Sequence, residues 1–293
     1  MPAVADQVHR FLFEHANVRG ELIHLDDSYR EVLERRGYPE VVARLLGESM
    51  AAAGLLSSTI KFRGSLILQI QGKGPVTMAV ASATHDRAVR AVARYGDSDV
   101  RDAPLNRLCT DGYLAITIDP EETEDRYQGI VALDTESLSE AVDNYFAQSE
   151  QLPTRIWLAC DGERAAGLLL QRVPGEPAGD DDAWNRAEHL AATITDTELL
   201  ELPAEDILGR LFHQEEVRLF APQPVHFHCQ CSRERIANVL VSLGGDEARS
   251  IIEEQGAIEA ECEFCGVGYT FDAVDVELLF SGDKQPPPSG AIH

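Results

Sequence analysis

Four cysteines in the last quarter of the chain limit its fold more than any other feature. Cys229 and Cys231 form a CxC pair, and Cys262 and Cys265 form a CxxC pair. Two close pairs separated by a segment of moderate length can present four thiolates to one tetrahedral zinc ion. Thiolates are also the form of cysteine that oxidants attack. The spacing therefore predicts a zinc site and leaves open whether that site is a passive staple or a redox switch.

The predicted site is coordinatively closed. Thirty residues, Ser232 to Glu261, separate the pairs, and two short helices would fill that gap. Four sulfur ligands leave no open position for a substrate water, which argues against a hydrolytic zinc enzyme. His226 and His228 lie beside Cys229 and could replace a ligand, but with four thiols present we expect ordinary solvent-facing strand histidines. Cys109 and Cys160 stand alone on apolar stretches, where isolated cysteines are usually small buried hydrophobes, and we assign them no function.

Charge excludes several classes of partner. The chain has 293 residues and a formal net charge of -25, so phosphate backbones and anionic lipid surfaces would be repelled. We therefore expect neither nucleic acid nor membrane partners. The first fifteen residues lack the pattern of a signal peptide, and no apolar run approaches the ~20 residues of a membrane span. A cytoplasmic location is expected, where grouped cysteines bind metal or carry out redox chemistry.

Residues 1–173 are predicted to form an α+β core. A helix capped by Asp26 or Asp27 should end near Gly37, and a longer one should run from Pro39 to about Leu56. A capping box, Ser137-x-x-Glu140, precedes a third helix with Leu138, Ala141, Val142, Tyr145 and Phe146 on one face. The strands are expected at Val18–Leu25, Gly64–Gln71, Pro75–Ser82, Gly112–Asp119, Tyr127–Leu133, Arg155–Ala159 and Ala165–Arg172, with hairpins at Gly72–Gly74 and Asp161–Glu163.

Residues 174–225 are predicted to be a helical linker. Pro174–Asp182 has linker composition, and helices are expected at about Ala183–Thr193, Asp196–Leu200 and Pro203–Gln214. Acidic residues are frequent and apolar ones sparse, and short helices of this kind are marginal without a surface to pack on. Two interpretations stay open: a metastable subdomain docked on the core, or an ordinary helical hairpin of the fold.

Residues 226–293 are predicted to be a small zinc-binding module. Ser232 should cap a helix with Ile236, Val239, Leu240 and Leu243 on one face, and Asp246 should cap a second helix closed by Gly256. Short strands at Ile258–Cys262 and Tyr269–Phe271 would flank the CxxC turn, and the polar tail from Lys284 is predicted to be disordered. So small a unit has little core and needs a staple.

The spacing within each pair bears on the choice between staple and switch. If the module folds only around metal, oxidising the ligands unfolds it, because metal binding energy is folding energy. A CxxC disulfide between Cys262 and Cys265 would carry little strain. One between Cys229 and Cys231 would close a tight, easily reduced ring. This favours a reversible switch without excluding a structural site.

The chain closely resembles the heat-shock protein 33 family of redox-regulated chaperones over essentially its whole length. The C-terminal marks of the resemblance are Cys229-Gln-Cys-Ser-Arg-Glu-Arg235 and Gly256-x-Ile-Glu-x-x-Cys-x-Phe-Cys-Gly266, followed by Tyr269-x-Phe. The marks in the core are Tyr127-Gln-Gly-Ile-Val131 and Tyr145-Phe-x-x-Ser-Glu-Gln-Leu-Pro-Thr154. None of the four thiols departs from the family pattern.

The resemblance implies a redox-regulated, ATP-independent holdase rather than an enzyme. The reduced, inactive form would hold one Zn²⁺ per chain on Cys229, Cys231, Cys262 and Cys265. Oxidation would form Cys229–Cys231 and Cys262–Cys265 disulfides, release zinc and unfold the linker from about Gly179 to Pro224. The exposed apolar surface would bind unfolding client proteins, and the oxidised protein would be a homodimer. The absence of a Walker A motif fits ATP independence.

Two alternatives come from other functional classes. A thiol–disulfide oxidoreductase would need one exposed cysteine of low pKa, usually in a CxxC at a helix N-terminus. A zinc-ribbon adaptor for nucleic acid would need a basic face, whereas acids outnumber Arg233, Arg235, Arg249 and Lys284 in the C-terminal module.

Overall fold

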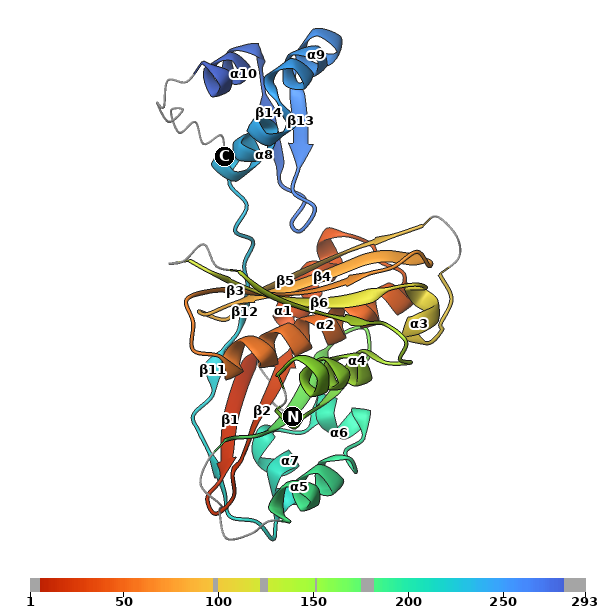
Figure 1. Cartoon of the computed structure of the whole chain (residues 1–293), viewed down its shortest axis with the longest axis vertical. Coiled ribbons are helices and arrows are strands. Elements are labelled where there is room, and N and C mark those ends of the chain that lie inside the picture. The colour runs from red at the N-terminus through yellow and green to blue at the C-terminus, as the bar shows by residue number, and fades with distance from the viewer. Residues whose placement is uncertain (1–5, 97–99, 122–125, 151, 175–181, 282–293) are drawn as a thin grey trace. The chain divides into compact units, whose positions relative to one another are not determined.

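The computed structural model describes residues 6–96, 100–121, 126–150, 152–174 and 182–281. The chain divides into two compact units, Met1–Cys229 and Gln230–His293, and we describe each by itself. Both contain helices and strands, as predicted (Figure 1). Within the described ranges, no helix is long and apolar enough to cross a membrane.

The first unit contains two six-stranded sheets. Sheet A has the order β10-β1-β2-β9-β8, with β11 also paired to β1, and its pairings are antiparallel. Its strands are β1 (Gln7–Phe13), β2 (Val18–Leu25), β8 (Thr154–Cys160), β9 (Ala165–Arg172), β10 (Val217–Leu219) and β11 (Gln223–Pro224). Strands β2, β8 and β9 were predicted, whereas β1, β10 and β11 were not.

Sheet B has the order β12-β5-β4-β3-β6-β7 and is antiparallel except where β12 pairs in parallel with β5. The prediction found β3, β4, β6 and β7 but missed β5 and β12. The strands are β3 (Gly64–Gln71), β4 (Val76–Thr84), β5 (Ala88–Tyr95), β6 (Tyr113–Pro120), β7 (Tyr127–Ala132) and β12 (His226–Phe227).

Helix α2 (Glu40–Thr59) lies between the two sheets, and its side chains join both of them in one core (Figure 1). It begins after Pro39, as predicted, and extends three residues beyond Leu56. Two glycines allow the close approach to sheet A. A Cβ on Gly54 would lie 2.4 Å from the Cδ1 of Ile23, and a Cβ on Gly47 would lie 2.5 Å from the sulfur of Cys160.

Two caps differ from the prediction. Helix α1 (Asp27–Arg35) follows Asp26, but the side chain of Asp26 does not cap it. The carboxylate of Asp6 does so instead, accepting from the backbone N–H of Asp26 and, at 2.7 Å, from that of Ser28. Before helix α4 (Leu138–Tyr145) the box is only half formed. Ser137 accepts from the N–H of Glu140, whereas the Glu140 carboxylate accepts from Glu136.

Three linker helices cover the face of sheet A opposite α2 (Figure 1). They are α5 (Ala183–Ala191), α6 (Asp196–Glu201) and α7 (Ala204–Phe212), close to the predicted ranges. Their apolar stripe is denser than the sequence indicated. Phe212 packs edge-on against Phe13, with ring centroids 5.0 Å apart, and is 2 % exposed. Residues 175–181 of the predicted linker lie outside the described residues.

The second unit contains three helices and a hairpin among its described residues: α8 (Arg233–Leu243), α9 (Gly245–Gln255), α10 (Ala273–Phe280), β13 (Ile258–Glu261) and β14 (Gly268–Phe271). Ser232 caps α8, as predicted. The face predicted for α8 was only partly right: Leu240 is buried and Ile236 packs against the same cluster, whereas Val239 and Leu243 are exposed and Ala237 is buried in their place.

The α9 cap was also wrong, because Gly244 at φ 104° precedes the helix and Asp246 lies inside its first turn. Helix α10 was not predicted. Most of the predicted disordered tail, from residue 282 onward, lies outside the described residues. The short α3 (Leu105–Leu108) and the π-helical turn η1 (Phe146–Glu150) complete the described elements of the chain.

The Asp6 cap yields a direct stability prediction. Asp6→Ala removes the acceptor of the α1 N-terminus, and we expect it to lower the free energy of unfolding by about 1 kcal/mol, a typical loss for a cap. Asp27→Ala is the matched control, since Asp27 is exposed and only pairs with Arg30 on the surface. It should change stability by less. Urea denaturation of both variants tests this, and equal losses would contradict the assigned cap.

Candidate metal centre

The structure brings the four cysteines of the two pairs together. The sulfur atoms of Cys229, Cys231, Cys262 and Cys265 all lie within 4.8 Å of one another. A tetrahedral zinc with Zn–S bonds of about 2.3 Å needs sulfurs about 3.8 Å apart, so this spacing fits a four-thiolate site. No disulfide is formed within the set. The sulfurs of Cys231 and Cys265 are 3.3 Å apart, well beyond the ~2.05 Å of a covalent bond.

Local structure explains how each pair is held. Cys229 follows β12 by two residues, and Cys231 directly precedes the Ser232 cap of α8. Cys262 and Cys265 lie in the turn between β13 and β14. In that turn the N–H of Gly266 donates to the carbonyl of Cys262 at 2.8 Å, and the N–H of Cys262 donates to Val267 at 2.9 Å.

Gly266 has φ 71°, a backbone conformation that glycine adopts without strain. The turn therefore aims both sulfurs of the CxxC pair to one side. Both side chains are buried, at 7 % exposure, while Cys229 and Cys231 are partly exposed.

Two further side chains contact the sulfurs. The hydroxyl of Tyr269 donates to the sulfur of Cys231 at 3.2 Å, and the guanidinium of Arg90 donates to the sulfur of Cys229 at 3.6 Å. The contact with Cys231 raises the pKa of Tyr269, because a phenolate would face the sulfur. Donors of this kind stabilise thiolate charge and orient metal ligands. The sequence prediction missed Arg90, which lies 139 residues from Cys229 and carries no local signal.

The remaining candidates lie outside the cluster. His226 is exposed on β12, and neither it nor His228 belongs to the group of metal-ligating atoms found among the described residues. Burial raises the pKa of Cys109 to about 11 and that of Cys160 to about 11. Both are therefore thiols near neutral pH, and thiols are poor nucleophiles and poor ligands.

Comparison with known proteins agrees with the geometry. A family described as Hsp33 protein matches residues 6–272. The chain is 50 % identical over 295 residues to the 33 kDa chaperonin of Pseudomonas aeruginosa, with 99 % of each chain covered. It is 44 % identical over 292 residues to the 33 kDa chaperonin of Methylobacillus flagellatus, again with 99 % of each covered. The chain belongs to the Hsp33 family.

The fold of an Hsp33 homologue is similar as well. The crystal structure of the 33 kDa chaperonin from Thermotoga maritima matches with a TM-score of 0.77. The match covers 94 % of this chain and 98 % of that one at 22 % identity, which establishes a shared fold. The two bacterial relatives at 44 % and 50 % identity are both named 33 kDa chaperonin.

Tyr269 provides a test of the metal centre. Tyr269→Phe removes the hydroxyl that donates to Cys231 but keeps the ring, so we expect metal affinity to fall by about tenfold, as is typical of lost outer-shell contacts. Competition with a chromophoric chelator under reducing conditions measures this. Tyr113→Phe is the control, because that hydroxyl donates to Gln71 in sheet B. An unchanged affinity in Tyr269→Phe would argue against the assigned role.

Proposed function

We propose that the protein is a redox-regulated, ATP-independent holdase. In the reduced state Cys229, Cys231, Cys262 and Cys265 would hold one Zn²⁺ per chain, and the linker would stay docked on the core. Oxidation would release the metal and free the linker, and unfolding client proteins would bind the uncovered surface. The observation that carries the proposal is a closed cluster of four cysteine sulfurs whose first ligand, Cys229, is separated by three short strands from the helices that cover sheet A.

The path of the chain supports this coupling. Between α7 and Cys229 the chain forms β10, β11 and β12, which have three, two and two residues. Strands this short contribute few ladder hydrogen bonds each, so they resist opening weakly. A change at Cys229 therefore acts on a segment of low local stability that leads directly to the linker helices.

The surface beneath the linker suits a chaperone. It carries large apolar side chains, which are buried by α5, α6 and α7: Phe11, Phe13, Leu22, Leu168 and Leu170. A contiguous apolar patch of this kind, once uncovered, binds other apolar chains. The acidity of the whole chain would keep the opened form soluble.

The oxidation step balances with peroxide as the oxidant. In each cysteine pair the two thiolates give up two electrons and form one S–S bond, while hydrogen peroxide takes up the electrons with two protons and becomes two waters. The proposed products are the Cys229–Cys231 and Cys262–Cys265 disulfides. Thiolate sulfur is the preferred ligand type for zinc, and its oxidation removes the charge that holds the metal.

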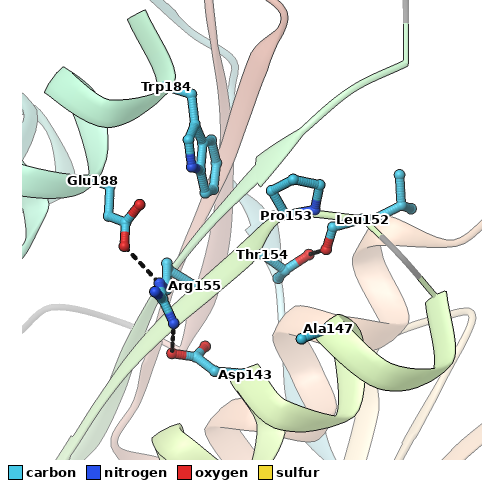
Figure 2. A pocket seen from close by; sticks show the side chains of 8 residues that line it. All are labelled: Asp143, Ala147, Leu152, Pro153, Thr154, Arg155, Trp184 and Glu188. Carbon is cyan, nitrogen blue, oxygen red and sulfur yellow. Dashed lines mark hydrogen bonds and ion pairs between the residues drawn. The ribbon is translucent and has the colours of Figure 1, made fainter. Parts of the chain in front are cut away.

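An ion-pair bridge fastens the first linker helix to the core (Figure 2). Arg155 on β8 donates to Asp143 of α4 at 3.2 Å and to Glu188 of α5 at 2.7 Å. The bridge borders a cavity of about 400 Å³ that is also lined by Trp184 of α5 and Pro153. Burial raises the pKa of Asp143 to about 6, although Arg155 opposes the shift.

We further propose a cytoplasmic location, client proteins as partners and a homodimer after oxidation. The three-part division of the chain at residues 173 and 225 also remains a proposal. The arginines of the second unit argue against a nucleic-acid adaptor. Arg233 pairs with Asp275 at 2.7 Å, and Arg249 pairs with Glu277 at 2.8 Å, so neither contributes to an open basic face.

The central prediction concerns oxidation. Treatment with peroxide at raised temperature should release one zinc per chain, consume four thiols and start suppression of client aggregation, because the ligands are lost. Cys109→Ser is the matched control and should respond like the parent. If reduced, zinc-loaded protein suppressed aggregation equally well, the switch would be refuted. Insulin-reducing activity would favour an oxidoreductase.

The Arg155 bridge gives a second prediction. Arg155→Met keeps the aliphatic stem but breaks both ion pairs, and we expect docking of α5 to weaken by about 1 kcal/mol, roughly fivefold in the undocked population. Peroxide should then activate the variant faster than the parent. Arg126→Met, which removes an exposed pair with Asp119, is the control. Equal activation rates in the two variants would count against the bridge.

A further inference from the structure

Two buried histidines lie between sheet A and the linker helices. His9 on β1 and His24 on β2 are each 3 % exposed. His9 is two residues from Phe11 on β1, and His24 is two residues from Leu22 on β2. Because residues two apart in a strand lie on the same face, both histidines lie on the face that the linker covers, and their side chains point toward α6 and α7. The strand register pairs Gln7 with His24 and His9 with Leu22, which makes the two histidines diagonal neighbours.

One hydrogen bond ties the side chain of His24 to the linker. Its Nε2 lies 3.0 Å from the carbonyl oxygen of Leu199 in α6. That carbonyl has no helical donor four residues later, because Pro203 has no N–H. The neutral ring with its proton on Nε2 supplies the missing donor. Among the described residues Nδ1 has no partner, and neither ring nitrogen of His9 has one.

We propose that His9 and His24 form an acid-sensitive contact beneath the linker, so that acidification weakens the docking of α6 and α7 while the cysteines stay reduced. A second proton on either ring would place a charge and an N–H without an acceptor in an apolar interface. Released into water, the same rings would take up a proton below their ordinary pKa of about 6.5. Protons therefore favour the undocked linker.

The neighbouring charges act in different directions. Glu205 of α7 favours a charged His9, whereas Arg164 in the β8–β9 turn, which is 3.8 Å from Glu201 of α6, opposes a charged His24. The two histidines repel each other when both are charged. Opposite the histidines, strand β9 contributes the apolar side chains Ala166 and Leu168 to this face, and its one charged residue there, Arg172, lies at the far end, opposite Val18.

The lowered pKa values of the two histidines set the direction and the size of the pH effect on linker docking. Burial lowers the pKa of His24 to about 4 and also lowers that of His9. The docking free energy contributed by His24 is thus complete above its ordinary pKa of about 6.5 and is lost as the pH falls toward 4. Between pH 7.5 and pH 5.5, His24 alone should weaken docking by about tenfold, and His9 should add to this.

Two carboxyl groups oppose this effect. Burial and the neighbouring Asp196 of α6 raise the pKa of Glu48 on α2 to about 7, and burial raises that of Asp143 to about 6. Where the linker causes that burial, acid strengthens docking at these positions. The contribution of the histidines is therefore the difference between the parent and variants without them.

Hydrogen exchange of residues 183–212 in the reduced, zinc-loaded full chain tests the proposal. His24→Gln keeps a donor for Leu199 without a titrating group, and His9→Leu replaces a ring that makes no hydrogen bond. The ratio of linker exchange in the parent to that in the double variant should rise at least tenfold from pH 7.5 to pH 5.5. The single His24→Gln should give most of this change. His213→Gln, at an exposed position, should behave like the parent.

The proposal would be overturned if the ratio of linker exchange in the parent to that in the variant did not change with pH, for both the single His24→Gln and the double variant. Any effect of the acid-sensitive contact on client capture rests on the proposed function, but the experiment distinguishes failure of the contact from failure of the proposed function. If the linker loosens at pH 5.5 but no client is captured, the acid-sensitive contact stands and the proposed masking of the client surface fails. If the linker stays docked at pH 5.5 while peroxide still activates the protein at pH 7.5, the acid-sensitive contact fails and the proposed function stands.

Discussion

The structure depends on a sheet that is apolar on both faces. Along β9 the residues from Ala165 to Gln171 are all buried, because α2 covers one face of sheet A and the linker helices cover the other. An antiparallel sheet usually leaves one face to water. Here the second face must be covered by a separate segment of chain, and that cover is held by three short helices. Stability of the core and access to an apolar surface therefore depend on the same contact.

The second unit likewise depends on one set of contacts, those at the candidate metal centre. Among its described residues, up to Ser281, the second unit buries a small cluster around Leu240, Ala248 and Phe271, too little to hold such a fold firmly without a staple. A metal ion held by the four sulfurs, as proposed, would join the start of α8 to the β13–β14 turn and act as a cross-link in place of a larger core. A unit that depends on its cross-link responds steeply to loss of the cross-link, which is the property that a sensor requires.

Much of this was predictable from the sequence, and the failures share a physical cause. The cysteine spacing, the Ser232 cap and the strands with clear alternation were predicted correctly. Strand β1 was missed because His9 and Arg10 interrupt its apolar pattern, and β10 to β12 were missed because two or three residues carry no period. The partners of the site were missed as well, since Arg90 reaches Cys229 only through the pairing of β12 with β5. Long-range pairing leaves no trace in a local window.

The linker is joined to sheet A through a strand that lies outside the segment proposed to open. It leaves the sheet after Arg172 of β9, which pairs with β2 and β8. If it is released as proposed, it stays covalently tethered to β9, so its helices remain at a high effective concentration near their own docking face. An extended client must then compete with an intramolecular rival that is always present. Such competition gives a holdase a means of discharging its client that requires neither a nucleotide nor a second protein.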